Sequence, residues 1–511
     1  MTDTDSSNTD EDIKSTSIEE AIAKLQEENL LFVDQEGNGH FAVNGSGAKV
    51  FPTTSRKFSK YIRKCLSTQL NRRDIGRHTV DLVQQTLDCT AEVDGKTIPL
   101  NVRLAREDNA QGLPETIYYD LRDGAYAIKI NADGWHIVPT PVKFRCFDHL
   151  LPQVRPLKTD SRNLECLRPL MPNLKNDDWL LYQVFLVSLF VPNFPRPLLC
   201  VDGVNGSGKS SLLKLTANLA DPSSISAGLS MIRNAEEIRR LANKYQLLYF
   251  DNASRLSFEV SDLLCVLSTG GSSVRRQLYE TDSDLIYSNV YRSVLICGIP
   301  RVAERADLVE RCINLSLSRI ESAERRPQSE LDSYYKEHKA EILGSIMNIL
   351  SDALGKVGQV KLESLPRLAD FAMLGYSIAE NIDGYSGDMF MKAYEHMRKR
   401  SDQFAIDASP VAQAVQYLLS STDEWSGRPT EAWQLKVKDG HEITPEEMEI
   451  RQEIRSNPYY PKHASAFTKE LVRCQGILSA IGIEVECTNN GHAVWKNEGR
   501  TINLRRRKQE G

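Results

Sequence analysis

The chain has 511 residues, of which 41% are hydrophobic, and a formal net charge of −6. One hydrophobic core supports roughly 250–300 residues, so this length predicts about three domains. No apolar stretch reaches the roughly 20 residues of a membrane span, and the first residues lack the basic and apolar segments of a signal peptide, which predicts a cytoplasmic protein without a membrane partner.

The ten cysteines form no C-x-x-C pair. This pattern argues against a zinc site and a disulfide framework, and it predicts reduced thiols that mostly lie in the core.

Residues 1–20 are unusually acidic, with seven Asp and Glu residues against one lysine. Their Ser-, Thr- and Asp-rich composition is typical of a disordered tail. Because this tail accounts for the net charge, the remaining chain is neutral overall and is free to have basic faces.

Residues 21–156 are predicted to form an α+β accessory domain. An amphipathic helical pattern is followed by a second helix whose apolar positions are surrounded by Arg56, Lys57, Lys60, Arg63 and Lys64. That basic set is either an ordinary solvated helix surface or a phosphate-contacting surface. Short strands separated by Asp/Gly turns follow in residues 96–145. Because no closely spaced carboxylate pair lies on a convincing strand in this domain, primase activity is not predicted.

Residues 160–326 alternate strands and helices, which predicts an α/β domain with a parallel sheet and a ligand at the carboxyl ends of its strands. Between the strand PLLCVD and the helix SSLLKLTANL, the spacing of Gly203, Gly208, Lys209 and Ser210 satisfies G-x-x-x-x-G-K-[ST]. This P-loop pattern supplies backbone N–H groups and a lysine to a bound triphosphate.

The P-loop predicts ATP and Mg²⁺ as cofactors. Gly206 lets the loop approach the phosphates, Lys209 reaches the β- and γ-phosphates, and Ser210 holds the magnesium ion. The residues expected to bind the nucleotide are Gly203, Gly206, Ser207, Gly208, Lys209, Ser210 and Ser211.

The apolar strand QLLYFDN ends in Asp251, which we expect to support the magnesium ion, the alternative being a carboxylate that caps the strand end. Asn252 follows, where many hydrolysing P-loop proteins have a glutamate. An amide cannot accept a proton, so either Asn252 only positions the attacking water or another acid activates it.

Between the second and third strands, the stretch LSTGGSSVRRQLYETDSDLIYSNVYRSVLICGIPRV carries the matching residues Thr269, Gly270, Gly271, Arg276, Leu278 and Tyr279. It resembles the signature of superfamily-three-like AAA+ helicases of phages, plasmids and integrated elements. The resemblance covers roughly residues 160–320 and implies a P-loop AAA+ core that assembles into a ring of identical subunits, with a hexamer as one option. It also implies that Arg275 and Arg276 contact DNA.

Two features bear on hydrolysis. Cys297 stands where the resembling family has a sensor asparagine, and a thiol is the poorer hydrogen-bond partner, so hydrolysis is expected to be slow unless Asn252 substitutes. The run RVAERADLVERCINL resembles the R-x-D-L-x-x-R segment that presents an arginine to a neighbouring subunit's ATP. It offers Arg305 and Arg311, with Arg301 also open, and the alternative is a surface helix with ordinary ion pairs.

The rest of the chain is predicted to form a helical lid over the nucleotide (residues 327–405) and a winged helix (residues 409–511). Lys462, Lys469 and Arg473 can lie along one helix, and the following segment reads as two strands around an Asn-Gly turn. Such a helix and hairpin contact DNA phosphates without reading sequence, although winged helices also serve protein contacts.

These features together predict an ATP-binding and ATP-hydrolysing DNA helicase for mobile-element replication, with DNA, copies of itself and other replication proteins as partners. The main alternative is an ATP-switched DNA-binding initiator or regulator that does not unwind DNA. A third option, a P-loop kinase or other small-molecule transferase, leaves the winged helix unused.

Overall fold

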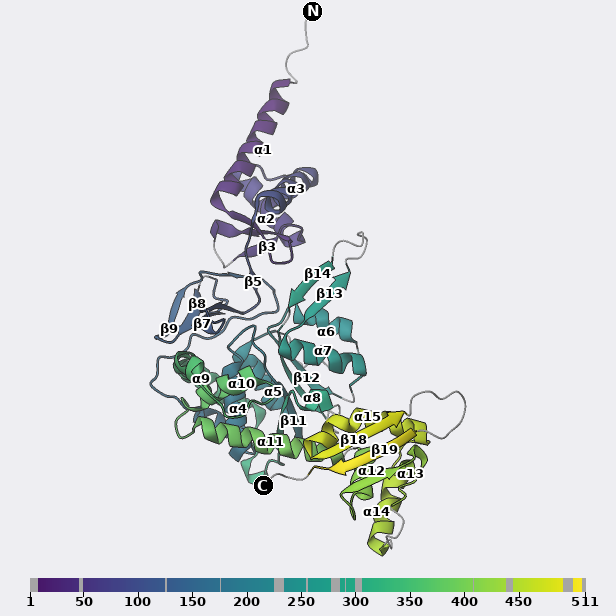
Figure 1. Ribbon diagram of the computed structural model, residues 1–511. Coiled ribbons are helices and arrows are strands. Elements are labelled where there is room, and N and C mark those ends of the chain that lie inside the picture. Colours follow the sequence, from purple (N-terminus) through teal and green to yellow (C-terminus); the bar gives the residue numbers. More distant parts are fainter. Residues whose placement is uncertain are drawn as a thin grey trace, which may run out of the picture.

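The computed structural model describes residues 8–45, 49–124, 126–174, 176–224, 234–253, 256–276, 285–289, 291–298, 306–407, 409–437, 444–489 and 500–507. Figure 1 shows an N-terminal unit at the top, a large core in the middle and a C-terminal unit, in yellow, at the lower right. Within these residues, no helix is both long enough and apolar enough to cross a membrane.

The N-terminal unit (residues 8–97) packs helices on one small sheet with the strand order β3-β2-β1-β4. In α2, the side chain of Ser55 caps the first turn by accepting a hydrogen bond from the Phe58 amide, and Phe58, Ile62 and Leu66 are fully buried at a spacing of four residues. One face of α2 therefore packs into the unit, and the opposite face is left to solvent. The elements are α1 (Asn8–Glu28), β1 (Leu30–Val33), β2 (Gly39–Ala42), β3 (Val50–Pro52), α2 (Arg56–Gln69), α3 (Arg77–Asp94) and β4 (Lys96–Thr97).

The strand unit (residues 100–144) is an antiparallel sheet, β6-β7-β8-β9, beside a short parallel pair of β5 and β10. Its elements are β5 (Leu100–Asn101), β6 (Leu104–Asp108), β7 (Pro114–Asp120), β8 (Tyr126–Asn131), β9 (Gly134–Pro139) and β10 (Lys143–Phe144). Ile117, Ile128 and Trp135 belong to the apolar cluster that continues to Met397. The range 21–156, predicted as one domain, contributes to several apolar clusters, two of which extend into the core.

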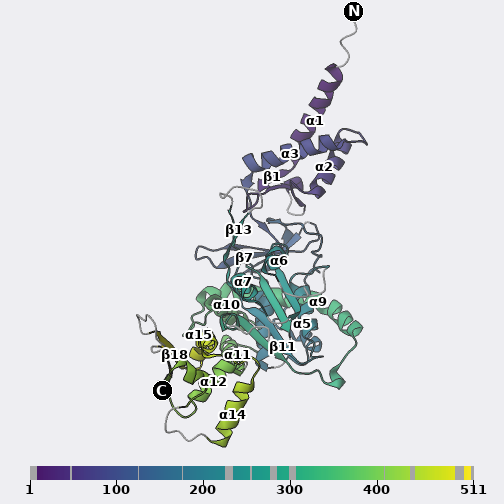
Figure 2. The ribbon, with the colours of Figure 1, turned by 90° about the vertical axis from the view of Figure 1, so that its right-hand side faces the viewer.

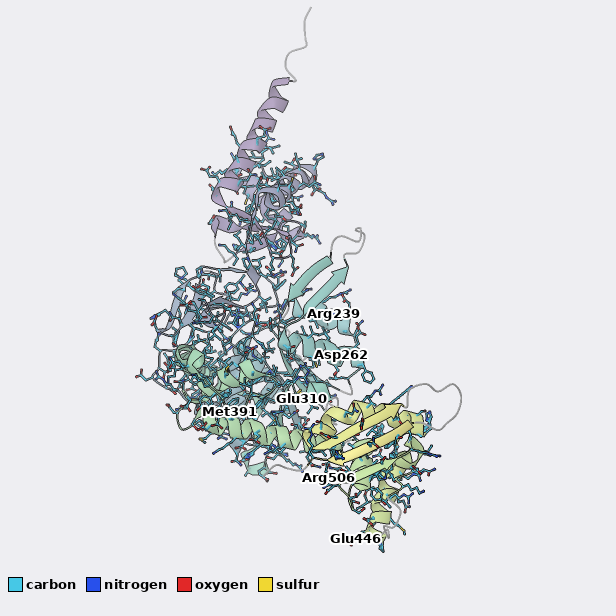
Figure 3. The ribbon with its side chains drawn as sticks, in the orientation of Figure 1. Arg239, Asp262, Glu310, Met391, Glu446 and Arg506 are labelled. Carbon is cyan, nitrogen blue, oxygen red and sulfur yellow. The ribbon has the colours of Figure 1, made fainter. Side chains whose placement is uncertain are left out.

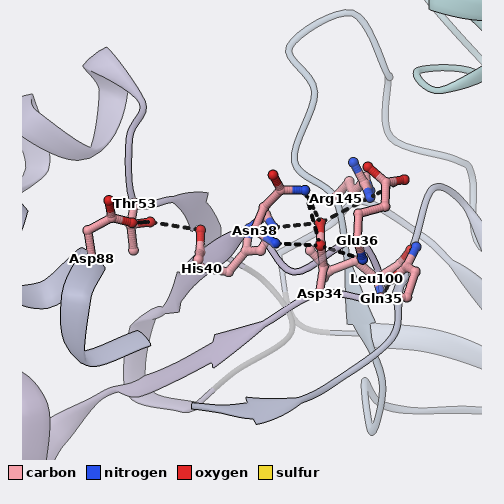
Figure 4. A network of polar contacts seen from close by, with 10 residues as sticks. Asp34, Gln35, Glu36, Asn38, His40, Thr53, Asp88, Leu100 and Arg145 are labelled. Carbon is pink, nitrogen blue, oxygen red and sulfur yellow. Dashed lines mark hydrogen bonds and ion pairs between the residues drawn. The ribbon is translucent and has the colours of Figure 1, made fainter. Parts of the chain in front are cut away.

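A polar network joins the N-terminal unit to the strand unit (Figure 4). Asp34, which is 1% exposed, accepts hydrogen bonds from His40 at 2.9 Å and from Arg145 at 3.2 Å. Arg145 follows β10, so this buried carboxylate links a loop of the first unit to the end of the second.

The central sheet has four parallel strands in the order β12-β15-β11-β16. Successive residues of β11 alternate between two apolar clusters, Leu199 and Val201 in one and Leu198 and Cys200 in the other, so both faces of the sheet are covered. The predicted α/β class with a parallel sheet is confirmed. The sheet strands are β11 (Leu198–Gly203), β12 (Leu247–Ala253), β15 (Ser293–Gly298) and β16 (Cys312–Leu317).

The helices of this region are α4 (Asn176–Ser188), α5 (Lys209–Ala220), α6 (Ala235–Ala242), α7 (Phe258–Thr269) and α8 (Ala306–Val309). A separate antiparallel ribbon of β13 (Ser272–Arg276) and β14 (Leu285–Asn289) stands beyond α6 and α7 (Figure 1).

The helical segment (residues 327–407) consists of α9 (Gln328–Lys356), α10 (Ala369–Ala379) and α11 (Gly387–Asp407). All three helices contact the buried helix α4, and α9 also contacts β8 and β9 of the strand unit. Short 3-10 helices lie at Val43–Gly45, Glu165–Leu170, Ser322–Glu324 and Val357–Gln359.

The C-terminal unit (residues 409–507) has its own apolar cluster around a three-stranded antiparallel sheet in the order β17-β19-β18. The hydroxyl of Ser409 caps its first helix by accepting a hydrogen bond from the Ala412 amide, with Pro410 in the first turn. Helix α15 also contacts α8 and α11 of the core. The elements are α12 (Pro410–Leu418), β17 (Glu424–Gly427), α13 (Pro429–Trp433), α14 (Pro445–Ser456), α15 (Ala464–Ala480), β18 (Ile483–Asn489) and β19 (Arg500–Arg506).

Candidate nucleotide-binding site

A glycine-rich loop joins the end of β11 to the start of α5. Gly206 and Gly208 have φ values of +79° and +83°, in the left-handed region that only glycine adopts at little cost. At Gly203 the constraint is space, because a Cβ there would lie 2.6 Å from the carbonyl oxygen of Leu317. The glycines thus serve two purposes, loop curvature and close packing of the loop on β16.

Lys209 is the first residue of α5, and its side chain folds back over the loop. Its Nζ donates hydrogen bonds to the carbonyl oxygens of Gly203 at 2.6 Å and Val204 at 3.0 Å. The ammonium group is therefore held at the loop by backbone carbonyls, which a phosphate group can replace as acceptors.

Ser210 and Asp251 meet at the carboxyl edge of the sheet. The Ser210 Oγ donates a hydrogen bond to the Asp251 Oδ1 at 2.7 Å, although the two residues are 41 positions apart. They meet because β11 and β12 run parallel and end at the same edge. A hydroxyl and a carboxylate in contact form an oxygen donor set of the kind that Mg²⁺ prefers.

Cys297, at the end of β15, completes this group. Its Sγ lies 3.0 Å from the Asp251 Oδ1, and the residue is 1% exposed. Burial, followed by the hydrogen bond to Asp251, raises the pKa of the Cys297 thiol to about 12. The protonated thiol therefore donates to the carboxylate that also accepts from Ser210.

Asn252 adopts an unusual backbone conformation at the end of β12. Its φ is +55°, and the pairing of β12 with β15 is irregular between Phe250 and Ala253. This irregularity leaves Asn252 exposed at the same edge as Asp251. Sequence reasoning anticipated its position but not the left-handed backbone.

The remaining predicted loop residues differ in exposure. Ser207 is 1% exposed beneath the loop, whereas Ser211 is exposed on the first turn of α5. The buried side chain of Asn173 donates to the carbonyl oxygens of Ser207 at 2.8 Å and Ser318 at 2.6 Å. Sequence reasoning missed Asn173, because nothing in its neighbourhood marks it as a support of a loop 34 residues away.

Among the predicted arginines, Arg311 lies apart from this edge. The Arg311 carbonyl accepts a hydrogen bond from the Leu198 amide, so Arg311 stands where β11 begins, at the opposite edge of the sheet from the glycine loop. Its neighbour Glu310, labelled in Figure 3, pairs with Arg367. Arg305 lies outside the described residues, as does Arg301. Arg311 therefore cannot serve the loop of its own chain.

The predicted DNA-contacting residues fall on two other elements. Arg275 and Arg276 lie on β13, where their backbones pair with Ile286 and Leu285 of β14, and their side chains lie outside the described part. Lys462, Lys469 and Arg473 are exposed on or just before α15. Arg473 pairs with Glu470 at 2.9 Å, and its guanidinium lies 5.1 Å from the ring centroid of Phe258 in α7. Thus, of these three residues, Arg473 is the one at the junction with the core.

Comparisons with curated proteins and with solved structures carry no argument about the site. A comparison with curated proteins finds no match. Among solved structures, the C-terminal region of NrS-1 is 10% identical, with 94% of this chain and 98% of that chain covered and a TM-score of 0.43. The structure titled "SCCmec type IV Cch - active helicase" is 11% identical, with 93% and 92% covered and a TM-score of 0.43. Scores this low carry no argument about function.

Family models give a more specific result. Residues 165–397 match the model of the actinomycete integrative conjugative element replication protein, and residues 411–510 match the model of the C-terminal domain of the same protein, AICE RepA. The two matches follow each other in the chain, cover well over half of it, and confirm the expected link to mobile-element replication. The chain belongs to the AICE RepA family of replication proteins.

Proposed function

We propose that this protein is an ATP-dependent DNA motor that acts in replication of an integrative conjugative element. The observation that carries the proposal is the meeting of the glycine-rich loop, Lys209, Ser210 and Asp251 at one edge of the parallel sheet, with Ser210 Oγ and Asp251 Oδ1 at 2.7 Å. In this proposal residues 160–326 form a P-loop AAA+ core, residues 327–405 its helical lid and residues 409–511 a winged helix.

ATP with Mg²⁺ fits the residues present. The loop amides and Lys209 would hold the phosphates, and Ser210 with Asp251 would hold the metal ion, which supplies positive charge to the β- and γ-phosphates. Lys209 exchanges its bonds to two loop carbonyls for phosphate oxygens. The Cys297 thiol donates to Asp251 and would keep that carboxylate oriented toward the metal ion.

Hydrolysis requires groups from beyond this edge. Asn252 can orient a water molecule but cannot take its proton. Arg311 lies at the other end of the sheet and acts only on the nucleotide of a neighbouring copy, where a positive charge stabilises the transferred phosphoryl group. A ring of identical subunits, with Arg305 or Arg311 as the arginine supplied in trans, is part of this proposal.

DNA is the proposed substrate of the motor. The helix, strand and helix order of the C-terminal unit, with β18 and β19 after α15, supports the winged-helix assignment, and Lys462 and Lys469 present exposed charges at α15. Arg275 and Arg276 lie on the ribbon that projects from the core. In the motor they grip backbone phosphates irrespective of the bases.

Substitution of Lys209 tests the nucleotide site. Lys209→Ala should abolish ATP binding and leave the melting temperature unchanged, because the side chain donates its hydrogen bonds to loop carbonyls and not to core groups. Lys214→Ala, an exposed lysine of the same helix, is the matched control and should bind ATP normally. Titration with a fluorescent ATP analogue measures both variants, and normal binding by Lys209→Ala would refute the P-loop assignment.

The alternative function is an ATP-switched initiator that assembles on DNA without unwinding it. Asn252 and Cys297 favour this alternative, because Asn252 cannot act as the base and Cys297 lacks the sensor amide of a fast hydrolase. A strand-displacement assay with ATP, beside an ATPase assay with and without single-stranded DNA, separates the two. The motor displaces a strand and shows DNA-stimulated turnover, whereas the initiator binds ATP and DNA but does neither.

A further inference from the structure

Helix α2 presents a basic face to solvent. Arg56, Lys60, Arg63 and Lys64 are all exposed, at helical spacings of four, seven and eight residues from Arg56. This spacing places them on one side of the helix. The opposite side is the buried one described above, so the orientation of the charges is fixed by packing of the apolar side into the unit.

The charged surface continues past the end of the helix. Arg72 and Arg73 are exposed in the turn between α2 and α3, and Asp74 is the one acidic residue among residues 53–80. We call Arg56, Lys60, Arg63, Lys64, Arg72 and Arg73 the basic face.

The ion pairs of the described residues near the basic face involve other cations. Two neighbouring cations are neutralised, Lys57 by Asp148 and Arg77 by Asp81. No carboxylate of the described residues forms an ion pair with any member of the basic face. Six adjacent cations repel one another, so binding of a polyanion relieves this repulsion and releases the counterions of that polyanion.

The shape of the surface favours double-stranded DNA. Proteins that grip single strands combine basic grooves with exposed aromatic rings on which bases stack. In the described part of the N-terminal unit, the exposed large apolar side chains are Leu82 and Val93, and the Tyr61 ring of α2 is stacked on Phe51 at 5.2 Å. A helix of 14 residues spans about 21 Å, enough to run beside several phosphates of a duplex.

We propose that the basic face is a second, sequence-independent contact for the phosphate backbone of duplex DNA. It lies outside both segments that match the replication-protein family, residues 165–397 and 411–510. Figures 1 and 2 place the N-terminal unit and the C-terminal unit at opposite ends of the molecule, with the core between them. The proposal builds on the proposed DNA-dependent function and adds a duplex grip at the end far from α15.

The attachment of the N-terminal unit gives this grip a mechanical connection. Lys57 pairs with Asp148 beyond the strand unit, and Arg145 pairs with Asp34 and, at 3.5 Å, with Glu36. These contacts tie α2 and the β1–β2 loop to the chain that leads into the core. The contacts therefore connect the basic face to the part of the chain that carries the nucleotide site.

The test is the salt dependence of duplex binding by the full chain without nucleotide. Each phosphate contact contributes about 0.9 to the slope of log affinity against log salt concentration, so the triple variant Lys60→Gln, Arg63→Gln and Lys64→Gln should lower the slope by about two to three. Its affinity for a random-sequence duplex should fall at least about tenfold at low salt. The matched control neutralises Lys336, Lys361 and Lys392, three exposed lysines of the helical segment, and should leave the slope unchanged.

A second pair of variants separates charge from folding. The charge-preserving triple Lys60→Arg, Arg63→Lys and Lys64→Arg should bind as the wild type does. Arg72→Gln with Arg73→Gln, located in a turn, should lower the slope by about two without changing the melting temperature.

The results distinguish this proposal from the proposed function. A flattened slope with normal ATP binding supports the basic face whatever the outcome of the Lys209→Ala experiment. An unchanged slope in both the helix triple and the turn pair overturns it. The proposal is also overturned if the triple variant loses affinity for single-stranded DNA alone. The same holds if the triple variant loses binding to anionic phosphatidylserine vesicles while its duplex affinity stays constant.

Discussion

Replacement of Arg103 by methionine should destabilise the core severely. Arg103 is fully buried just before β6, and its Nε pairs with the Oδ1 of Asp221 at 3.0 Å. Its other nitrogens donate to the carbonyl oxygens of Asp120, Leu151 and Pro222. One guanidinium thus joins the strand unit to the end of helix α5, which starts at the glycine-rich loop.

The magnitude follows from what the substitution leaves behind. Asp221 keeps its hydrogen bonds from the Gln246 and Leu247 amides, but it loses its charged partner at 1% side-chain exposure. Removing one partner of a buried ion pair costs about 3–5 kcal/mol. For a domain of about 150–250 residues, where 1 kcal/mol shifts the melting temperature by about 2–4 °C, the expected loss is about 6–20 °C.

Thermal unfolding followed by tryptophan fluorescence provides the assay, because Trp135 and Trp179 are both buried in the apolar cluster shared by the strand unit and the core. The double variant Arg103→Met with Asp221→Asn removes the unpaired charge and should recover part of the loss. Arg103→Lys keeps the charge but not the planar set of donors, so its melting temperature should lie between those of Arg103→Met and the wild type. A melting temperature of Arg103→Met within about 2 °C of the wild type would refute the reasoning.

Two further substitutions test the polar contacts of Asp34 and Asp251. Burial alone would raise the pKa of Asp34, but hydrogen bonds from His40 and two backbone amides and the charge of Arg145 lower it to about 2. This carboxylate therefore stabilises the fold above its unfolded pKa of about 4, by about 2–3 kcal/mol, and the contribution disappears as pH falls from about 4 to 2. Asp34→Asn should weaken hydrogen-exchange protection of β1 and β2 at pH 7. It should also remove the decline of that protection between pH 4 and 2, and a decline identical to that of the wild type would contradict this. At the nucleotide site, Cys297→Ala should raise the Mg²⁺ concentration for half-maximal ATP binding about five- to tenfold, whereas Cys297→Ser keeps a donor to Asp251 and should stay near the wild type. Equal impairment of the Ser and Ala variants in a magnesium titration would show that the hydrogen bond is not what matters.

Patterns within short stretches of sequence were sufficient for the α/β class. The alternation of apolar strands with helices predicted the parallel sheet, because parallel strands require crossover helices that cover both faces. The same logic placed Asp251 at the edge that carries the loop, since the carboxyl ends of parallel strands share one edge. Arg311 shows the limit of this reasoning. Its position at the edge opposite the loop follows from the pairing of β16 with β11, which the spacing of motif residues does not predict.

The sequence by itself determined the features that depend on local spacing, namely the curvature of the glycine-rich loop, the two-sided burial of β11 and the charged side of α2. The tertiary structure alone decided which distant groups meet. Arg103 contacts Asp221 across 118 positions and Asn173 supports the loop at Ser207 across 34 positions. Neither contact leaves a periodic or compositional signal, because a buried polar group is satisfied by whichever partner the packed chain brings within hydrogen-bonding distance.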